Sequence, residues 1–457
     1  MTSPRARRPT PLSGFPELLP SQRAAEQVVL DSLRETFELH GFCSVETRSV
    51  EPLDQLLRKG ETSNEVYVLR RLHAADTESD SGADAGLGLH FDLTVPLARY
   101  VLENAGRLEF PFRGYQIQRC WRGERPQEGR FREFTQADID IIGRDELGVD
   151  ADVEVTAVMA EALSRLQLPP VTLQVNNRKL IEGFYRGIGA TDPAAVIRTV
   201  DKLDKLGTDS VRRALVEEAG LDETRADQCL ALANITGTDA SFAAEVRALG
   251  VSHPLLDEGL DALVRAIEGA AHANLARFYV VADLSIARGL DYYTGTVFEG
   301  RTAEHGSMSI CGGGRYDALA SDGRTTYPGV GISLGVTRLL APLFARGLVD
   351  ADRSVPSCVL VALPHDDRRA ECREVARQLR ARGIPTEVSP EAAKYGKQIR
   401  NASRRGIPYV WFPDAAAGAG QVRDIRSGKQ VDADPEAWLP PDADLRPRIR
   451  MSSEEPP

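Results

Sequence analysis

Charged and aromatic side chains alternate with apolar ones in the segment RFREFTQADIDIIG, residues 130–143. If the segment is a strand, successive side chains point to opposite faces, and Ala137, Ile139 and Ile141 form a buried face. The opposite face carries Arg130, Arg132, Phe134, Gln136, Asp138 and Asp140. A surface strand would also be polar there. An aromatic ring among charges, with Arg122 and Arg125 just upstream in WRGER, favours a binding site.

The segment HFDLTV alternates in the same way. As a strand it would place His90, Asp92 and Thr94 on one face. The carboxylate of Asp92 could bind a cationic amine through a charge-assisted hydrogen bond. A half-exposed strand with an ordinary aspartate is the simpler interpretation of this segment by itself.

An arginine in an apolar setting marks the segment ADLSIARGLDYYTGTVFEG. Burial of Arg288 is costly unless an anion pairs with it, and either a phosphate or a structural carboxylate would suit its planar fork. The segment does not decide between the two. The hydroxyls of Tyr292 and Tyr293 could bind a polar ring, although paired tyrosines also occur at the edge of a core.

Glycines and an arginine combine in PGVGISLGVTRLL. The pattern predicts a strand followed by a helix that begins near Val336, with Arg338 in its first turn. The helix dipole disfavours a cation at that end, and a bound phosphate chain would explain it. The chain has no GxxxxGK[ST] loop and no convincing dinucleotide fingerprint.

Basic residues also recur at helical spacing near the C-terminus. The stripe comprises Lys394, Lys397, Arg400, Arg404 and Arg405. Tyr395 and Trp411 are close in sequence and could stack on unpaired bases. Most charge runs are solvated surfaces. On a chain with 56 Lys and Arg against 67 Asp and Glu, a net charge of −11, such a stripe is a candidate nucleic-acid surface.

Composition limits the class of protein. The 457 residues are 42% hydrophobic and 27% charged, as in globular proteins. Six scattered cysteines and seven histidines show no CxxC or HExxH pattern, so a disulfide framework or zinc site is unsupported. No apolar run reaches membrane length, and the N-terminal segment MTSPRARRPTPLSGF lacks the apolar stretch of a secretory signal. We therefore expect a soluble cytoplasmic protein.

Periodicity predicts the elements that must position these residues. We expect a long helix ending near Gly41, a strand–turn–strand unit from Phe110 to Gly143, and a small C-terminal α/β domain with a mostly parallel sheet. The remaining segments are a disordered arm (1–13), an exposed acidic loop (73–88), a helical insert (185–275) and a flexible tail (441–457).

Taken together, the motifs resemble those of class II aminoacyl-tRNA synthetases. WRGERPQEGRFREFTQADIDIIG is similar to motif 2 of that class, and GVGISLGVTRLL is similar to motif 3. ARGLDYYTGTVFEG resembles the histidine-binding motif of the histidyl-tRNA synthetase family. DLTVPLARY, VDKLDK and YGKQIRNASRRGIPYVWF resemble that family too, and the similarity extends from Gly14 to about Val431.

The resemblance implies an α+β catalytic core, with a mixed, mostly antiparallel sheet flanked by helices, a helical insert and a C-terminal α/β anticodon-binding domain. The core would comprise residues 14–184 and 276–350, and the anticodon-binding domain residues 355–440. It further implies a homodimer that uses ATP, with Mg²⁺ bound through the phosphates rather than by dedicated protein ligands. L-Histidine would be activated to histidyl-adenylate and transferred to tRNA(His).

The resemblance also implies residue roles. Arg122, Arg288 and Arg338 would be catalytic and bind ATP. The other ATP-binding residues would be Glu124, Arg130 and Phe134. Histidine would be bound by Asp92, Thr94, Gln136, Asp140, Tyr292, Tyr293 and Tyr316. The tRNA would be bound by Lys394, Lys397, Arg400 and Arg404.

The chain departs from the class pattern at one position. In VETRSVEP, Arg48 stands where motif 1 usually has a proline, which is associated with the dimer interface. Two other readings remain open at this point. One is a synthetase-like regulatory subunit of histidine biosynthesis, which would typically lack the anticodon-binding domain and the phosphate-binding arginines. The other is a synthetase for threonine, proline or glycine, which the ARGLDYY segment argues against.

Overall fold

The computed structural model describes residues 10–57, 65–70, 86–166, 168–273, 277–287, 293–306, 308–413 and 420–452. The chain divides into two compact units. The first contains the residues up to Pro16 together with Ser32–Pro342, and the second contains Glu17–Asp31 together with Leu343–Pro457. The predicted arm (1–13) and acidic loop (73–88) fall mainly outside the described residues.

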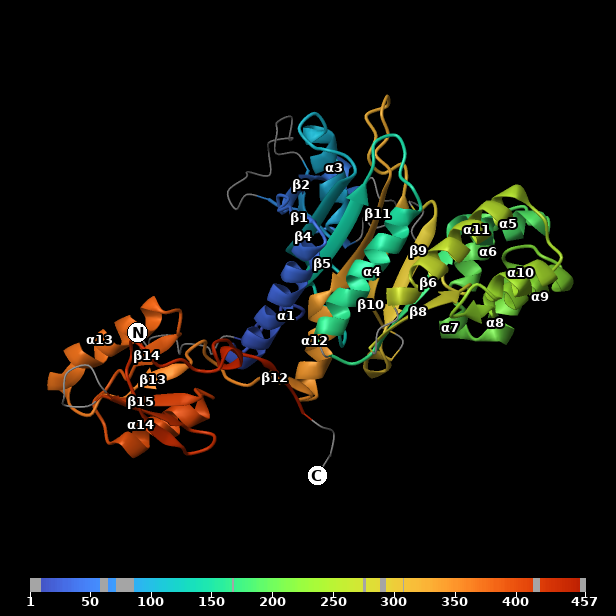
Figure 1. Ribbon diagram of the computed structural model, residues 1–457. Coiled ribbons are helices and arrows are strands. Elements are labelled where there is room, and N and C mark those ends of the chain that lie inside the picture. The colour runs from blue at the N-terminus through green and yellow to red at the C-terminus, as the bar shows by residue number, and fades with distance from the viewer. Residues whose placement is uncertain are drawn as a thin grey trace, which may run out of the picture. The chain divides into compact units, whose positions relative to one another are not determined.

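A nine-stranded sheet forms the centre of the first unit (Figure 1). In spatial order its strands are β1 (Cys43–Ser44), β4 (Phe112–Trp121), β5 (Glu133–Ile142), β11 (Gly329–Gly335), β10 (Ser309–Tyr316), β9 (Thr296–Arg301), β6 (Val171–Asn177), β8 (Phe278–Asp283) and β7 (Thr236–Gly237). Among these strands only β1/β4 and β6/β8 pair in parallel. The predicted mixed, mostly antiparallel sheet is therefore confirmed.

Helix α4 (Asp150–Arg165) covers one face of this sheet and crosses β5 and β11 (Figure 1). On that face the odd-numbered residues of β5, Ala137, Ile139 and Ile141, are buried. The ion pair between Arg315 of β10 and Asp152 of α4 joins the sheet to the helix on the same side. The even-numbered residues of β5 therefore point to the opposite face.

The helical insert follows β6 directly. It begins with α5 (Arg178–Gly187) rather than near residue 185, because the Asn177 side chain accepts a hydrogen bond from the Lys179 N–H and starts the helix. The insert's other helices are α6 (Pro193–Val200), α7 (Leu203–Leu206), α8 (Thr208–Glu217), α9 (Glu223–Ala233), α10 (Phe242–Ala248), α11 (Pro254–Gly269) and the 3₁₀ turn η3 (Ala271–Ala273). A Cβ at Gly259 would lie 2.1 Å from the Leu180 nitrogen, so glycine allows α5 and α11 to pack closely.

Shorter elements complete the first unit. They are α2 (Leu53–Leu56), α3 (Thr94–Asn104), the pair β2 (Val50–Pro52) and β3 (Leu87–Leu89), and the 3₁₀ turn η4 (Ala303–His305). The strand prediction for HFDLTV is wrong, since β3 ends at Leu89 and α3 begins at Thr94. The Asp92 carboxylate accepts the Val95 N–H at 3.2 Å, and Pro96 is favoured in a first helical turn.

Two long helices agree with the sequence patterns. They are α1 (Pro20–Leu39) and α12 (Val336–Ala345). Beyond α1, Gly41 has φ 77°, a conformation that glycine adopts without strain. Both predictions are confirmed.

The second unit contains a five-stranded sheet with helices α13 (Arg369–Ala381) and α14 (Tyr395–Arg404). Its spatial order is β14 (Thr386–Val388), β13 (Val359–Val361), β15 (Tyr409–Pro413), β16 (Gly420–Asp424) and β17 (Gln430–Ala433). The prediction of a mostly parallel sheet is wrong, because β15, β16 and β17 pair antiparallel. The connection from Pro413 to Gly420 is too short for a parallel crossover.

The segment predicted as a flexible tail is ordered from residue 441 to residue 452. It contains the 3₁₀ turn η6 (Asp442–Asp444) and β18 (Ile449–Met451), which pairs with β12 (Val349–Ala351). A further 3₁₀ turn, η5 (Asp366–Arg368), precedes α13. Asp444 is buried because Tyr409 and Arg426 bind its carboxylate. Polar composition misled the prediction, since these charges pair with each other inside the fold.

Candidate active site

Strand β5 places three polar side chains in a cleft on the face of the sheet away from α4. Its register sets Gln136 opposite Gly335, Asp138 opposite Ser333, and Asp140 opposite Gly331 of β11. The three β5 side chains are buried, at 8%, 3% and 4% exposure. Buried carboxylates are rare without partners or a ligand. The sheet therefore concentrates hydrogen-bonding groups at one place.

The inner part of the cleft is a cavity of about 90 Å³. It is lined by side chains of Asp92, Thr94, Arg122, Gln136, Asp138, Asp140, Tyr293, Tyr316 and Ser333, and by glycines of β10 and β11. Every histidine-binding residue predicted from the resemblance lies here except Tyr292, which is outside the described residues, as is Arg288. Tyr293, the first described residue after that gap, lines the cavity.

Hydrogen bonds fix the orientation of the inner side chains. The Tyr316 hydroxyl donates to the Asp140 carboxylate at 2.7 Å. The Gln136 amide donates to the Ser333 hydroxyl, which in turn donates to Asp138. The amide oxygen of Gln136 is buried without a hydrogen-bond partner. An unsatisfied buried acceptor costs about 1–3 kcal/mol, so a ligand that let this amide pair both of its polar atoms would gain affinity.

Glycines keep this cavity open. A Cβ at Gly331 would lie 2.1 Å from the Asp140 Oδ1, and a Cβ at Gly314 would lie 2.7 Å from the Tyr293 ring. Side chains at these two positions would fill the space beside the binding groups. The glycine-rich strands are therefore required by the shape of the cleft.

The outer part of the cleft is a cavity of about 100 Å³. The residues that line it include Arg122, Glu124, Arg130, Phe131, Phe134, Cys311 and Arg338. Both cavities are lined by Arg122, Gln136, Gly312 and Ser333, so they form one continuous cleft.

Two predicted catalytic arginines line the outer cavity. The Arg122 Nε donates to the Phe91 carbonyl at 3.0 Å, and its guanidinium lies 5.0 Å from the Phe134 ring centroid. The Arg338 Nη1 donates to the Ser309 carbonyl at 3.0 Å. These contacts hold two permanent cations, one from the β4–β5 hairpin and one from α12, beside the same space.

Carboxylates moderate this positive charge. Glu124 lies 3.0 Å from Arg130 and 4.0 Å from Arg122. Burial raises the pKa of the Glu65 carboxyl, and the like charge of Glu124 raises it further, while Arg122 and Arg130 lower it. The rim of the outer cavity therefore carries both signs of charge.

The sequence did not single out all of these residues. Ser333 was missed as a lining residue, although it is the one polar side chain between apolar ones in GVGISLG. Asp138 was recognised on the polar face of the strand but not assigned to the site, although it shares that face with Gln136 and Asp140. Glu65 gave no sequence signal, because its proximity to Arg122 depends on the fold.

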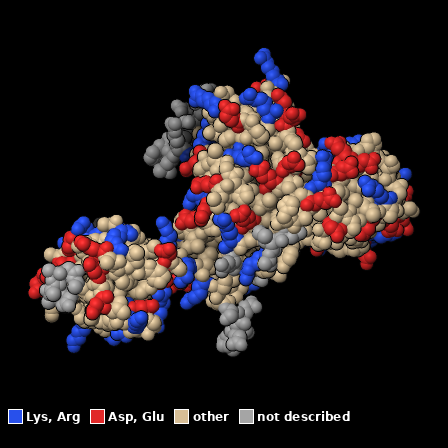
Figure 2. Space-filling model, in the orientation of Figure 1, with Lys and Arg blue, Asp and Glu red and all other residues tan. Residues whose placement is uncertain are grey.

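The basic stripe lies on α14 in the second unit. Lys394, Lys397, Arg400 and Arg404 are exposed, which keeps them candidates for a nucleic-acid surface. Arg405 is instead paired with Glu387. The suggestion that Trp411 stacks on bases is wrong, since its side chain is fully buried in the core. Figure 2 shows acidic and basic side chains interspersed over the visible face.

Within the described residues, every helix is too short or too polar to span a membrane. No group of three or more His, Cys, Asp or Glu side chains in that part of the chain is arranged to hold a metal ion.

A mostly antiparallel sheet with a motif 2-like hairpin and a motif 3-like strand and helix around one cleft defines a class II aminoacyl-tRNA synthetase. The sequence profile of the family "Histidyl-tRNA synthetase" matches residues 14–339, and that of the "Anticodon binding domain" matches residues 357–438. The chain therefore belongs to the histidyl-tRNA synthetase family and is an aminoacyl-tRNA synthetase.

Individual relatives agree with this assignment. The chain is 58% identical to a histidine–tRNA ligase of Cutibacterium acnes, with 96% of this chain and 98% of that protein covered. It is 55% identical to a histidine–tRNA ligase of Micrococcus luteus, with 98% and 100% covered. The crystal structure of histidyl-tRNA synthetase from Nostoc has a TM-score of 0.82 at 32% identity and covers 94% of this chain and 97% of its own.

Proposed function

We propose that the chain is a histidine–tRNA ligase that joins L-histidine to the 3′ end of tRNA(His) through histidyl-adenylate. The observation that carries the proposal is the continuous cleft, in which the inner cavity with Asp140 and Tyr316 opens to the outer cavity with Arg122 and Arg338. A zwitterionic amino acid with a polar ring suits the first part. A nucleoside triphosphate suits the second.

Histidine occupies the inner cavity. Asp92 and Thr94 hold its ammonium group, since Asp92 is buried at the amino end of α3 and supplies a carboxylate. Asp140 and Tyr293 bind the imidazole nitrogens, with Tyr292 and Tyr316 completing the pocket. Gln136 binds the carboxylate after its amide turns to present the nitrogen.

ATP occupies the outer cavity. Phe134 stacks on the adenine and Arg338 covers its other face and the γ-phosphate. Glu124 accepts from the adenine amino group, and Arg122 binds the α-phosphate. Arg130 lies at the same rim. Arg288, outside the described residues, is assigned to the opposite side of the α-phosphate.

The reaction requires no covalent bond to the protein. A carboxylate oxygen of histidine attacks the α-phosphorus, the new O–P bond forms, and the bond to pyrophosphate breaks. The protein's task is to hold these atoms in line and to stabilise the charge that develops on the α-phosphate oxygens. Arginines suit this task because they remain charged and bind phosphate oxygens in pairs.

Discrimination against other amino acids follows from the buried polar groups of the inner cavity. A side chain without imidazole nitrogens would leave Asp140 and a tyrosine hydroxyl without their ligand partners. Each such loss costs about 1–3 kcal/mol, and together they would reject a non-polar competitor.

The proposal includes Mg²⁺, which would be bound mainly through the phosphates of ATP and would supply positive charge there. The proposal also includes tRNA binding through Lys394, Lys397, Arg400 and Arg404. It further includes assembly of the chain into a homodimer and a cytoplasmic location.

The test is exchange of labelled pyrophosphate into ATP with each of the twenty amino acids in turn. Histidine should support exchange and the others should not. Absence of exchange with histidine would favour a regulatory protein. Exchange with another amino acid instead of histidine would mean that the chain activates that amino acid.

Arg288 is tested by the same assay. Arg288→Ala should abolish adenylate formation while the circular dichroism spectrum stays unchanged, because its charge is assigned to the α-phosphate. Near-normal turnover of this variant would remove Arg288 from the mechanism.

A further inference from the structure

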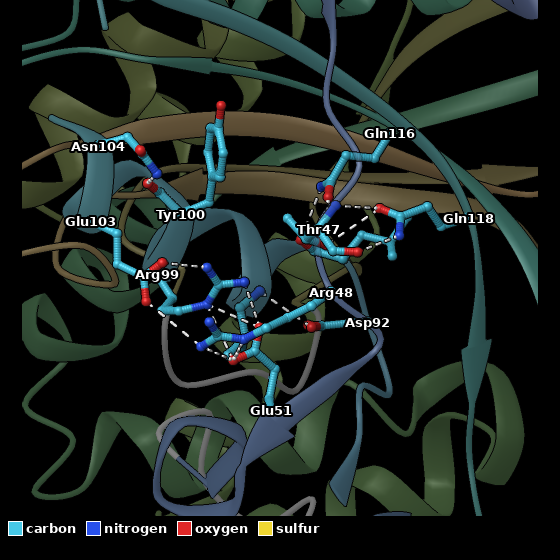
Figure 3. A network of polar contacts seen from close by, with 12 residues as sticks. Thr47, Arg48, Glu51, Asp92, Arg99, Tyr100, Glu103, Asn104, Gln116 and Gln118 are labelled. Atoms are coloured by element: carbon cyan, nitrogen blue, oxygen red, sulfur yellow. Dashed lines mark hydrogen bonds and ion pairs between the residues drawn. The ribbon is translucent and has the colours of Figure 1, made fainter. Parts of the chain in front are cut away.

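A fully buried carboxylate lies in a polar network next to the segment that carries Asp92 and Thr94 (Figure 3). Glu51 of β2 has 0% exposure. The Arg99 side chain of α3 donates to the Glu51 Oε1 from Nε at 2.9 Å and from Nη2 at 2.6 Å. The Arg48 Nη2 donates to the Glu51 Oε2 at 3.1 Å. This network ties β2 to α3.

A second set of bonds holds the beginning of the same segment (Figure 3). The buried Thr47 hydroxyl donates to the Gln116 Oε1 at 3.1 Å, and the Gln116 Nε2 donates to the Leu93 carbonyl at 3.0 Å. The Gln118 amide accepts from the Thr47 N–H at 3.1 Å and donates to the Thr47 carbonyl at 2.8 Å. Thr47 is thereby fixed to β4 and linked to the residue before Thr94.

Residues Thr47, Arg48 and Glu51 therefore hold the segment from Asp92 to Arg99 at two points, one on each side of Thr94. We call these three residues the clamp. A backbone bond from the His90 N–H to the Ser49 carbonyl, 3.0 Å long, adds a third contact. The first turn of α3 cannot shift without breaking bonds to buried groups.

We propose that the clamp positions the ammonium-binding groups of the histidine site, with Glu51 as the main positioning residue. The inference rests on the proposed function, which assigns the ammonium group to Asp92 and Thr94. It also gives Arg48, at the usual position of the motif 1 proline, a role within one subunit. Its half-exposed side chain neutralises Glu51 from the solvent side.

A purely structural role would have a different signature. Breaking a buried ion pair destabilises a fold by leaving a charge uncompensated, and this effect does not distinguish between histidine and ATP. A positioning role acts on the affinity for histidine and spares that for ATP, because the clamp's bonds reach Leu93, through Gln116, and Arg99. None of the bonds described above joins the clamp to a residue that lines the outer cavity. Comparing KM for histidine with KM for ATP therefore distinguishes a positioning role from a purely structural one.

The experiment is histidine-dependent pyrophosphate exchange with Glu51→Gln, which keeps the shape of the side chain and removes its charge. We expect KM for histidine to rise about tenfold through misplacement of the ammonium-binding groups, with KM for ATP nearly unchanged. The matched control is Glu103→Gln. Glu103 accepts from the Arg99 Nη1 at 2.8 Å, but it is 49% exposed. Exposed ion pairs contribute little, so KM for histidine should stay within about twofold.

An unchanged KM for histidine in folded Glu51→Gln, or equal increases of both constants, would overturn the inference. Thr47→Val and Arg48→Ala keep the test decisive if Glu51→Gln does not fold. Thr47→Val removes the link to Gln116, and Arg48→Ala leaves the Glu51–Arg99 bonds in place. Thr47→Val should raise KM for histidine several-fold, and Arg48→Ala should raise it by less. If neither variant changed KM for histidine, the inference would also be overturned.

Asp92→Asn separates this inference from the proposed function. That variant should lose most of its response to histidine, because it removes the charge that binds the ammonium group. A normal KM for histidine in Asp92→Asn would mean that the proposed assignment of the site fails. Loss of affinity in Asp92→Asn without any effect of the clamp variants would mean that only the clamp inference fails.

Discussion

The inner cavity and the C-terminal unit each contain a buried aspartate bound by a tyrosine hydroxyl. Asp140 accepts from Tyr316 at 2.7 Å, and Asp444 accepts from Tyr409 at 2.7 Å. Their exposures, 4% and 5%, are almost equal. The group that completes each site differs. Two nitrogens of Arg426 bind Asp444, each at 2.7 Å, whereas Asp140 borders a cavity kept open by Gly331.

Burial and pairing, which Asp140 and Asp444 share, therefore do not by themselves identify a functional carboxylate. The hydrogen bonds from Arg426 hold the pKa of Asp444 below its ordinary value despite burial. Such a satisfied cluster fixes a fold. A carboxylate beside a glycine-lined cavity can complete its bonding with a ligand.

Asp140→Asn should cause the largest loss. Because Asp140 is assigned to the imidazole, its conversion to an amide should lower kcat/KM for histidine about 10³-fold, with little effect on KM for ATP. Pyrophosphate exchange measures both. Asp444→Asn is the matched control and should exchange normally. Equal losses in the two variants would show that both aspartates are structural.

Gly331→Ala should reduce the histidine response about 10²-fold, since an added Cβ would lie 2.1 Å from the Asp140 Oδ1 and displace either the carboxylate or the ligand. Gly106→Ala is a suitable control, because a Cβ there meets no atom within 4 Å. Titration calorimetry with histidine gives the affinity directly. Normal binding by Gly331→Ala would mean that the cavity lies elsewhere.

The double variant with Lys397→Ala and Arg400→Ala should weaken tRNA binding about tenfold. Its log affinity should also fall less steeply with log salt concentration, with a slope smaller in magnitude by about 2. Adenylation should be unaffected. Filter binding across a salt series measures this. The control is Arg377→Ala on α13, an exposed arginine already paired with Glu374. A change in adenylation without a change in tRNA binding would contradict the assignment of α14.

Asp444→Asn should act on stability alone. Because the folded-state pKa of Asp444 is lowered, its charge contributes stability above about pH 4, the ordinary value, and this contribution is lost as pH falls through the folded-state pKa. At pH 7 the variant should lose about 1–3 kcal/mol in the free energy of unfolding. Urea unfolding at pH 7 and pH 3 checks this. A loss of equal size at both pH values would argue against ionic pairing.

Much of the fold was predictable because it rests on local periodicity. The polar and apolar faces of β5 follow from strict alternation, and Gly41 and Arg338 mark the end of α1 and the start of α12. HFDLTV has the same alternation as β5 but was mispredicted. There a local hydrogen bond from the Val95 N–H to Asp92 starts a helix instead.

Features that depend on distant contacts could not be predicted. The ordered segment around Asp444 needs Tyr409 and Arg426, and the burial of Trp411 follows from its place in the C-terminal core. Within the cleft, the residue types on β5 were recognisable. The partnership of Asp138 with Ser333 requires the pairing of β5 with β11, which no single segment encodes.

The central claim is that Arg122 and Arg338 bind one triphosphate while Asp140 binds the imidazole of histidine in the adjoining cavity. A crystal structure of the protein with histidine and a non-hydrolysable ATP analogue tests it most directly. We expect both guanidinium groups within hydrogen-bonding distance of the nucleotide, and an imidazole nitrogen within that distance of Asp140. A nucleotide bound outside this cleft, or histidine bound away from Asp140, would contradict the account.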